Sequence, residues 1–233
     1  ALAMALKGYV LRVQGRYTAA IAQCEAVLAL VEAGEGKEQV ALALAHRNAG
    51  LCYLRQGELE RGRLALQQAL EHYRQLDLAY DVGMVHHDLG LLHELMGDLV
   101  GAAGHYRAAL AYWEQIGSAG PWANTLNGLG VVQTLMGDYQ AAASTLDAAL
   151  ARSRQAGNRR VEAYVWASLG DLHRDRGAYG RARDAYLQTI DVAEHTRTGF
   201  IVMYALNALG NVARLSGDMG AAGGYLQRAM ELA

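Results

Sequence analysis

Apolar residues recur along this chain as pairs of helical stripes separated by a short turn. In one segment Leu89, Leu92 and Leu95 lie at helical spacing, and a second stripe follows Gly97 and Asp98. The second stripe consists of Ala102, Tyr106, Ala109 and Leu110. Because residues three, four and seven apart share one face of an α-helix, this pattern predicts two amphipathic helices joined by a tight turn.

The helix pair recurs six times, with a period of 40 residues after a first interval of 42. One glycine marks the middle of each first helix: Gly8, Gly50, Gly90, Gly130, Gly170 and Gly210. A second glycine follows seven residues later: Gly15, Gly57, Gly97, Gly137, Gly177 and Gly217. Such a fixed period is typical of solenoids. We therefore predict an all-α fold, an α-α superhelix of six helix-turn-helix repeats forming a single array over residues 1–233. The approximate repeats are 1–38, 39–78, 79–118, 119–158, 159–198 and 199–233.

The two glycines of each repeat are expected to do different work. The later one can end the first helix in the left-handed conformation, and Asp98, Asp138 and Asp218, which follow it, can cap the second helix. The earlier one costs roughly 1 kcal/mol relative to alanine inside a helix, so it needs a compensating contact. We expect that contact to be a close helix crossing at the small residue twelve positions later. These residues are Ala20, Gly62, Ala102, Ala142, Ala182 and Ala222.

The composition narrows the class of protein. The chain is 52% hydrophobic, with 13 Tyr but only one Phe and one Pro, which suits packed helices better than sheets. A net charge of −2 argues against a surface devoted to nucleic acid, and no run is long enough to span a membrane. Cys24 and Cys52 are too few for a disulfide framework or a zinc site. We read them as reduced core thiols of a cytoplasmic protein.

The repeat resembles the tetratricopeptide motif, which reads Trp-x2-Leu-Gly-x2-Tyr and then Ala-x3-Phe. The fifth unit matches it with Trp166, Leu169, Gly170, His173, Ala182 and Tyr186. The third unit matches it with His86, Leu89, Gly90, His93, Ala102 and Tyr106. The resemblance covers essentially the whole chain, although the family's usual unit has 34 residues and often ends in proline. It implies a scaffold that presents a binding surface and performs no chemistry of its own.

Forty-residue units with a Leu-Gly core and a Gly-Asp turn are similar to two groups within that family. One comprises the repeat arms of MalT-like bacterial transcriptional regulators, and the richness in alanine, arginine and glycine favours it. The other comprises adaptors of the Pins/LGN type, which hold extended peptides. We predict a non-catalytic interaction and signal-sensing arm of a bacterial regulator. The alternatives are a peptide-binding adaptor and a sensor of a small, sugar-like effector.

The resemblance places binding on a concave face lined by the first helices. Polar residues concentrate there at the positions three before, one after and four after the mid-helix glycine. Two tyrosines lie six positions before it. The candidates are Arg47, His87, Asn127, Asp171, Arg174, Asn207, Asn211, Arg214, Tyr164 and Tyr204. Asn and Arg can bond peptide amides or carboxylates, and tyrosines can stack on a sugar or a side chain. The alternative is that these residues are only the solvated side of amphipathic helices.

Other chemistry is not indicated. His46, His86, His87 and His93 could suggest a metal. Three of them, His46, His86 and His93, occupy aromatic positions of the repeat, and the four lack a Cys or carboxylate set with ligand spacing. We predict no metal, no cofactor and no catalytic residue. The ends of the sequence carry no polar capping helix, which terminal repeats need. We therefore expect a fragment of a longer protein, or a homodimer formed through an uncapped end.

Overall fold

The computed structural model describes residues 1–32, 39–194, 196 and 198–232. Over those residues the chain forms twelve α-helices and no strand, which confirms the predicted all-α, helix-turn-helix fold. The helices group into two compact units, Ala1–Ile116 and Gly117–Ala233. The predicted boundary between the first two repeats, at residue 38, lies outside the described residues. The single array over 1–233 stays a prediction.

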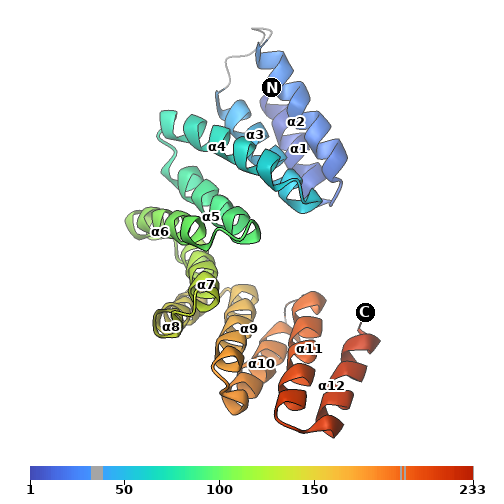
Figure 1. The fold of residues 1–233 in the computed structure, drawn as a ribbon. Helices are drawn as coiled ribbons and strands as arrows, with labels where there is room; N and C mark the ends of the chain where they lie inside the picture. The colour runs from blue at the N-terminus through green and yellow to red at the C-terminus, as the bar shows by residue number, and fades with distance from the viewer. Residues whose placement is uncertain (33–38, 195, 197, 233) are drawn as a thin grey trace. The chain divides into compact units, whose positions relative to one another are not determined.

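Unit 1 contains three helix pairs (Figure 1). Each second helix packs along its own first helix, and the first helices α1, α3 and α5 lie next to one another in order. The helices are α1 (Leu2–Val13), α2 (Tyr17–Glu32), α3 (Gln39–Gln56), α4 (Leu59–Gln75), α5 (Ala79–Leu95) and α6 (Leu99–Ile116).

Unit 2 repeats the same arrangement with its own three pairs (Figure 1). Its first helices α7, α9 and α11 again lie next to one another. The helices are α7 (Ala119–Leu135), α8 (Tyr139–Gln155), α9 (Arg159–Asp175), α10 (Tyr179–Glu194), α11 (Gly199–Leu215) and α12 (Met219–Glu231). Side chains on neighbouring first helices can therefore reach each other within a unit.

The turns inside the helix pairs form as the sequence predicts. All six turn glycines have positive φ, between 70° and 84°, which only glycine adopts readily. Asp98, Asp138 and Asp218 cap the following helices, accepting the backbone N–H three residues on at 2.9, 3.2 and 2.9 Å. Glu58 holds the same position in the second repeat and makes no side-chain cap bond.

The mid-helix glycines mark close helix crossings, as predicted. The small residue expected opposite each glycine is only part of the contact. A Cβ on Gly170 would lie 2.4 Å from the ring of Tyr186, and one on Gly130 would lie 2.6 Å from Leu146. The main contact is thus the large side chain sixteen positions later, which packs flat onto the glycine backbone. The small residue twelve positions later contributes its carbonyl oxygen, as at Gly50, where Gly62 O would lie 3.1 Å away. Small residues alone would leave this crossing without a side chain to bury.

Cys24 and Cys52 are both buried and free. Burial, helped by the neighbouring Cys52, raises the pKa of the Cys24 thiol to about 12. A thiol with so high a pKa stays protonated at neutral pH and is a weak nucleophile. Both cysteines therefore serve as small core side chains.

Candidate binding face

The predicted binding residues lie on the first helices. We call their positions, six and three before and one and four after each mid-helix glycine, the groove face. In unit 2 the groove face centres on Asp171 of α9. Its Oδ1 accepts hydrogen bonds from Tyr186 Oη and Arg174 Nη1, both at 2.8 Å. Its Oδ2 accepts from Tyr204 Oη at 2.6 Å. These four residues, which we call the Asp171 cluster, connect α9, α10 and α11.

The phenols of the Asp171 cluster are held in their protonated form. Burial, together with the Asp171 carboxylate, raises the pKa of both Tyr186 and Tyr204 well above the usual value. Each phenol therefore remains a donor to Asp171 over the physiological range. Arg174 also donates to Asp175 at 2.9 Å, so its charge is shared between two carboxylates. The cluster is a preformed polar platform between the fifth and sixth repeats.

A polar stripe extends from this platform along α11. Tyr204, Asn207, Asn211 and Arg214 are spaced three, four and three residues apart, which places them on one side of the helix. Asn207, Asn211 and Arg214 are exposed, and Tyr204 is partly covered, with 36% of its surface accessible. Asn207 Nδ2 donates to the Met203 carbonyl at 3.0 Å, and Arg214 Nη2 donates to Asn211 Oδ1 at 3.0 Å. Within the described part of unit 2, the amide oxygen of Asn207 and the amide nitrogen of Asn211 make no hydrogen bond, so both can serve a ligand.

Three of these predicted residues line one cavity. Asn207, Asn211 and Arg214 border a hollow of about 410 Å³ whose base is formed by Gly210 and small residues of α12. Leu226 and Met219 supply its apolar wall. Leu226 is exposed, whereas its counterpart Tyr186 in the preceding repeat is fully buried. The hollow thus combines amide and guanidinium groups with an accessible apolar surface.

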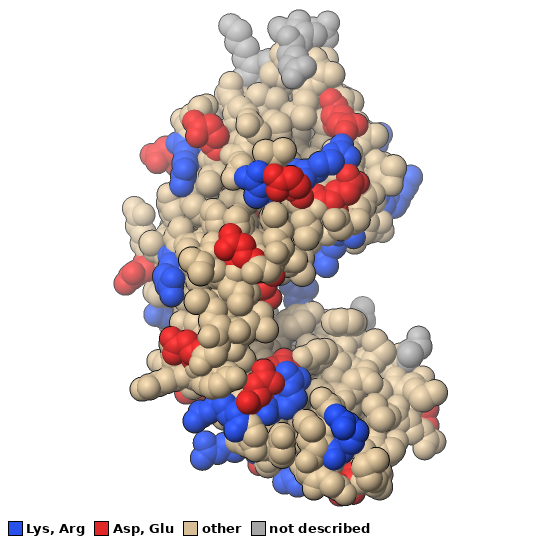
Figure 2. All heavy atoms as spheres, viewed as in Figure 1, with Lys and Arg blue, Asp and Glu red and all other residues tan. Residues whose placement is uncertain are grey.

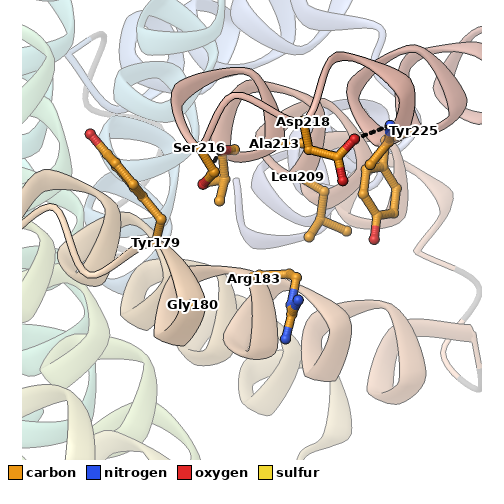
Figure 3. Close-up of a pocket in the computed structure, with 10 residues that line it drawn as sticks. Tyr179, Gly180, Arg183, Leu209, Ala213, Ser216, Asp218 and Tyr225 are labelled. Carbon is orange, nitrogen blue, oxygen red and sulfur yellow. Dashed lines mark hydrogen bonds between the residues drawn. The ribbon is translucent and has the colours of Figure 1, made fainter.

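A second cavity of unit 2, of about 270 Å³, lies against the opposite face of α11 (Figure 3). Tyr179 and Arg183 of α10 face Leu209 and Ala213 across it, and Asp218 and Tyr225 complete the lining. The Asp218 carboxylate is occupied by its capping bond to Ala221 N, and Ser216 Oγ donates to the Val212 carbonyl at 2.9 Å. Asp218 Oδ1 and the Ser216 hydroxyl therefore serve local structure, which makes this cavity the weaker candidate.

In unit 1 the predicted groove residues are engaged inside the protein. Arg47 Nε donates to Asp88 Oδ2 at 2.7 Å, and both side chains are largely buried. His87 packs its ring against Tyr106, with centroids 5.6 Å apart, and burial lowers the pKa of its imidazole. Arg12 likewise donates to Asn48 Oδ1 at 3.0 Å. The arginines here tie successive first helices together, so the structure does not present Arg47 as an open ligand contact.

The two remaining predicted residues are half-buried and lie in unit 2. Asn127 has its Oδ1 buried and without a hydrogen-bond partner in the described structure. Tyr164 packs against the buried cluster of Val192, Ala193 and Ile201. Neither residue lines the Asn207 cavity. Of the ten predicted residues, Asp171, Arg174, Tyr204, Asn207, Asn211 and Arg214 are brought together on α9 and α11.

Sequence reasoning missed three residues that accept or donate in these hydrogen bonds. Tyr186 matches the motif's second aromatic position, and its ring is buried, but its hydroxyl also holds Asp171. Asp88 lies two positions before a mid-helix glycine, where it receives Arg47 of the preceding repeat. Asn48 holds the same place one repeat earlier and receives Arg12. A polar residue at that position, with an arginine one repeat upstream, is the signal that could have revealed these ties.

The surface carries mixed charge. In Figure 2 acidic and basic side chains often lie beside one another, and most of the visible face carries neither. Arg61 pairs with Glu58 at 2.6 Å and Arg63 pairs with Glu60. No helix among the described residues is long and apolar enough to cross a membrane. In the same part of the chain no three metal-ligating side chains stand close enough to hold an ion.

Helix pairs stacked through their first helices, with variable polar residues on that face, define a helical-repeat interaction scaffold. The family model described as "Tetratricopeptide repeat" matches residues 1–75, 81–155 and 123–195. The chain belongs to the tetratricopeptide-repeat family. A search of curated protein sequences finds no match.

Solved structures show the same fold at low sequence identity. The apo form of RapI is 15% identical, with a TM-score of 0.78, over 99% of this chain and 83% of that one. NprR, solved with its cognate peptide NprX, is 14% identical, with a TM-score of 0.74, over 98% and 65%. A signal-transduction ATPase with a tetratricopeptide-repeat sensor, from Pyrococcus horikoshii, is 15% identical, with a TM-score of 0.75, over 97% and 35%.

Proposed function

We propose that this chain is a peptide-binding regulatory module whose groove face in unit 2 receives an extended peptide. The observation that carries the proposal is the exposed stripe of Tyr204, Asn207, Asn211 and Arg214 beside a cavity of about 410 Å³. Asparagine amides can pair with peptide N–H and C=O groups, and the cavity can receive one apolar side chain. The Asp171 cluster holds Tyr204 at one end of the stripe, so little ordering is required on binding.

The regulatory part of the proposal rests on the family and on the similar structures. NprR was solved with a peptide, and the Pyrococcus horikoshii protein carries its repeats as a sensor. We extend this to a non-catalytic, cytoplasmic arm of a bacterial transcriptional regulator that carries further domains beside the repeats. A Pins/LGN-type adaptor would use the same groove face. The gene around this segment separates the two, since a regulator requires nucleotide-binding and DNA-binding modules beside the repeats.

A binding screen tests the peptide proposal directly. Fluorescence polarisation with a library of short labelled peptides should yield binders, and Asn207→Ala with Asn211→Ala should weaken them about tenfold or more. The matched control is Arg183→Ala, because Arg183 lines the cavity on the opposite face of α11. Binders that respond to Arg183→Ala and ignore the asparagine pair would contradict the proposal.

A small effector is the second candidate, because the Asn207 cavity is large enough for a sugar-sized molecule. A thermal-shift screen with sugars addresses it. The effector would be favoured over the peptide at the same site by three results together. A sugar stabilises the wild-type chain, it has no effect on the asparagine double variant, and the peptide screen yields no binder.

A further inference from the structure

A separate cavity of about 440 Å³ lies in unit 1, away from the groove face. Arg74 of α4 and His86 of α5 form its polar side. Residues of α6 form the rest: Ala108, Ala111, Tyr112 and Gln115. A cavity of this size matches the range of small-ligand sites in proteins.

The polar side of the cavity has a defined hydrogen-bond order. Arg74 Nη2 lies 3.1 Å from His86 Nε2, and His86 Nδ1 lies 3.1 Å from His105 Nδ1. Arginine can only donate, so Nε2 of His86 accepts and its Nδ1 carries the proton given to His105. Tyr112 stacks on the His86 ring, with centroids 6.1 Å apart. The buried His86 is neutral, because burial and the neighbouring His105 and Arg74 lower its pKa to about 4.

The equivalent position in unit 2 shows that Arg74 lacks a carboxylate partner. Eighty residues later Arg154 corresponds to Arg74, and Trp166 corresponds to His86. Arg154 stands over the Trp166 ring at 5.6 Å and donates through Nε to Glu162 Oε1 at 2.8 Å. In unit 1 the position of Glu162 is held by Val82.

Arg74 therefore bonds an imidazole instead of a carboxylate. No ion pair to it is present among the residues that the structure describes. A guanidinium at a cavity mouth without a paired anion is a ready partner for a ligand carboxylate, which it can bind through two parallel N–H groups.

We propose that this cavity binds a carboxylate carried on a small apolar body, independently of the groove face. The ligand carboxylate takes the place that Glu162 fills beside Arg154. Arg74 then directs its N–H hydrogen bond to the carboxylate instead of the imidazole. His86 in turn donates to the carboxylate through Nε2, once its Nδ1 accepts a hydrogen bond from Nδ1 of His105. This exchange of tautomers along the two imidazoles requires no net proton. Tyr112 and the two alanines pack against the apolar body.

Isothermal titration of the full chain with matched probes tests the site. N-acetylphenylalanine carries the carboxylate and N-acetylphenylalaninamide lacks it, so the acid should bind about tenfold more tightly or better. Benzoate and a peptide with a free C-terminal phenylalanine distinguish a small acid from a chain end, and binding of either supports the site. Equal binding of acid and amide, preference for inorganic phosphate, or no binding of the acids at millimolar concentration overturns the proposal.

Three variants localise the binding. Arg74→Gln and His86→Leu should each weaken the acid about tenfold, whereas Arg154→Gln should leave it unchanged. Leucine is a fitting replacement because Leu126 and Leu206 hold the position of His86 in two other repeats. Circular dichroism verifies that each variant is folded. Undiminished acid binding by a folded Arg74→Gln chain rules out the assigned site.

Discussion

Units 1 and 2 use the same helix pair but place their polar residues differently. In the second and third repeats of unit 1 the position two before the mid-helix glycine is polar, and Asn48 and Asp88 receive arginines from the preceding repeat there. In unit 2 that position holds Gly128, Ser168 and Ala208, and Ser168 bonds only its own helix. The groove-face groups of α11 are exposed. One repeat framework can thus direct its variable residues either to cohesion between repeats or to a surface for partners.

The histidines divide in the same way. Six of the eight in the sequence belong to residues 1–116. Within unit 1 His86, His93 and His105 form a chain of rings, with centroid distances of 5.3 and 4.9 Å, and His46 stacks on His72 at 5.6 Å. Burial lowers the pKa of His46, His86 and His105, so the folded unit 1 holds these imidazoles neutral and resists their protonation. Acid should therefore affect the two units unequally.

The largest expected effect comes from removing the buried carboxylate of unit 1. Asp88→Ala leaves Arg47 largely buried and unpaired, which should cost about 4 kcal/mol of unfolding free energy. Asp171→Ala removes a more exposed partner of Arg174 and also the acceptor of the Tyr186 and Tyr204 hydroxyls, and should cost about 2 kcal/mol. Urea unfolding measures both, and hydrogen exchange read by mass spectrometry assigns each loss to its unit. Equal costs would mean that the two units do not differ in internal cohesion.

Acidification is the next test of the comparison. His86 has a folded pKa of about 4 against an unfolded value near 6.5, so the unfolded chain binds more protons between these pH values. Stability is present above pH 6.5 and is lost as pH falls toward 4, by about 3 kcal/mol for this group. His86→Leu should flatten that part of the pH dependence. Hydrogen exchange at pH 7 and pH 5 should show unit 1 opening first. A wild-type pH profile in the leucine variant would contradict the burial argument.

Overpacking the helix crossings should cost about 2 kcal/mol in either unit. A Cβ at position 90 would lie 2.6 Å from Tyr106, and one at position 170 would lie 2.4 Å from Tyr186. Both rings are buried and cannot move freely. Gly170→Ala should also weaken any groove-face ligand, because it displaces the phenol that holds Asp171. Gly90→Ala should leave that binding unchanged, and thermal melts with peptide titrations compare the two.

The fold was accessible from sequence because it depends on what every repeat shares. The turn glycines and the capping aspartates act within a few residues, and period and local chemistry suffice to place them. The site was only partly accessible. Asn207, Asn211 and Arg214 follow from helical spacing, but the engagement of Arg47 by Asp88 depends on a partner 41 residues away on another helix. The role of Tyr186 in the site could not be predicted, because its ring packs in the core while its hydroxyl donates to Asp171.

The smallest effect concerns the helices themselves. A Cβ added at Gly104 in α6 or at Gly224 in α12 would have no other atom within 4 Å, and both glycines have ordinary helical backbone. Replacing either with alanine removes the entropic cost of a helical glycine and should raise stability by about 0.5–1 kcal/mol. Urea unfolding of the two single variants measures the gain. Similar gains in both units would show that their helices have the same intrinsic propensity, so that the contrast between the units resides in polar contacts alone. A gain confined to one unit would instead trace part of that contrast to the backbone.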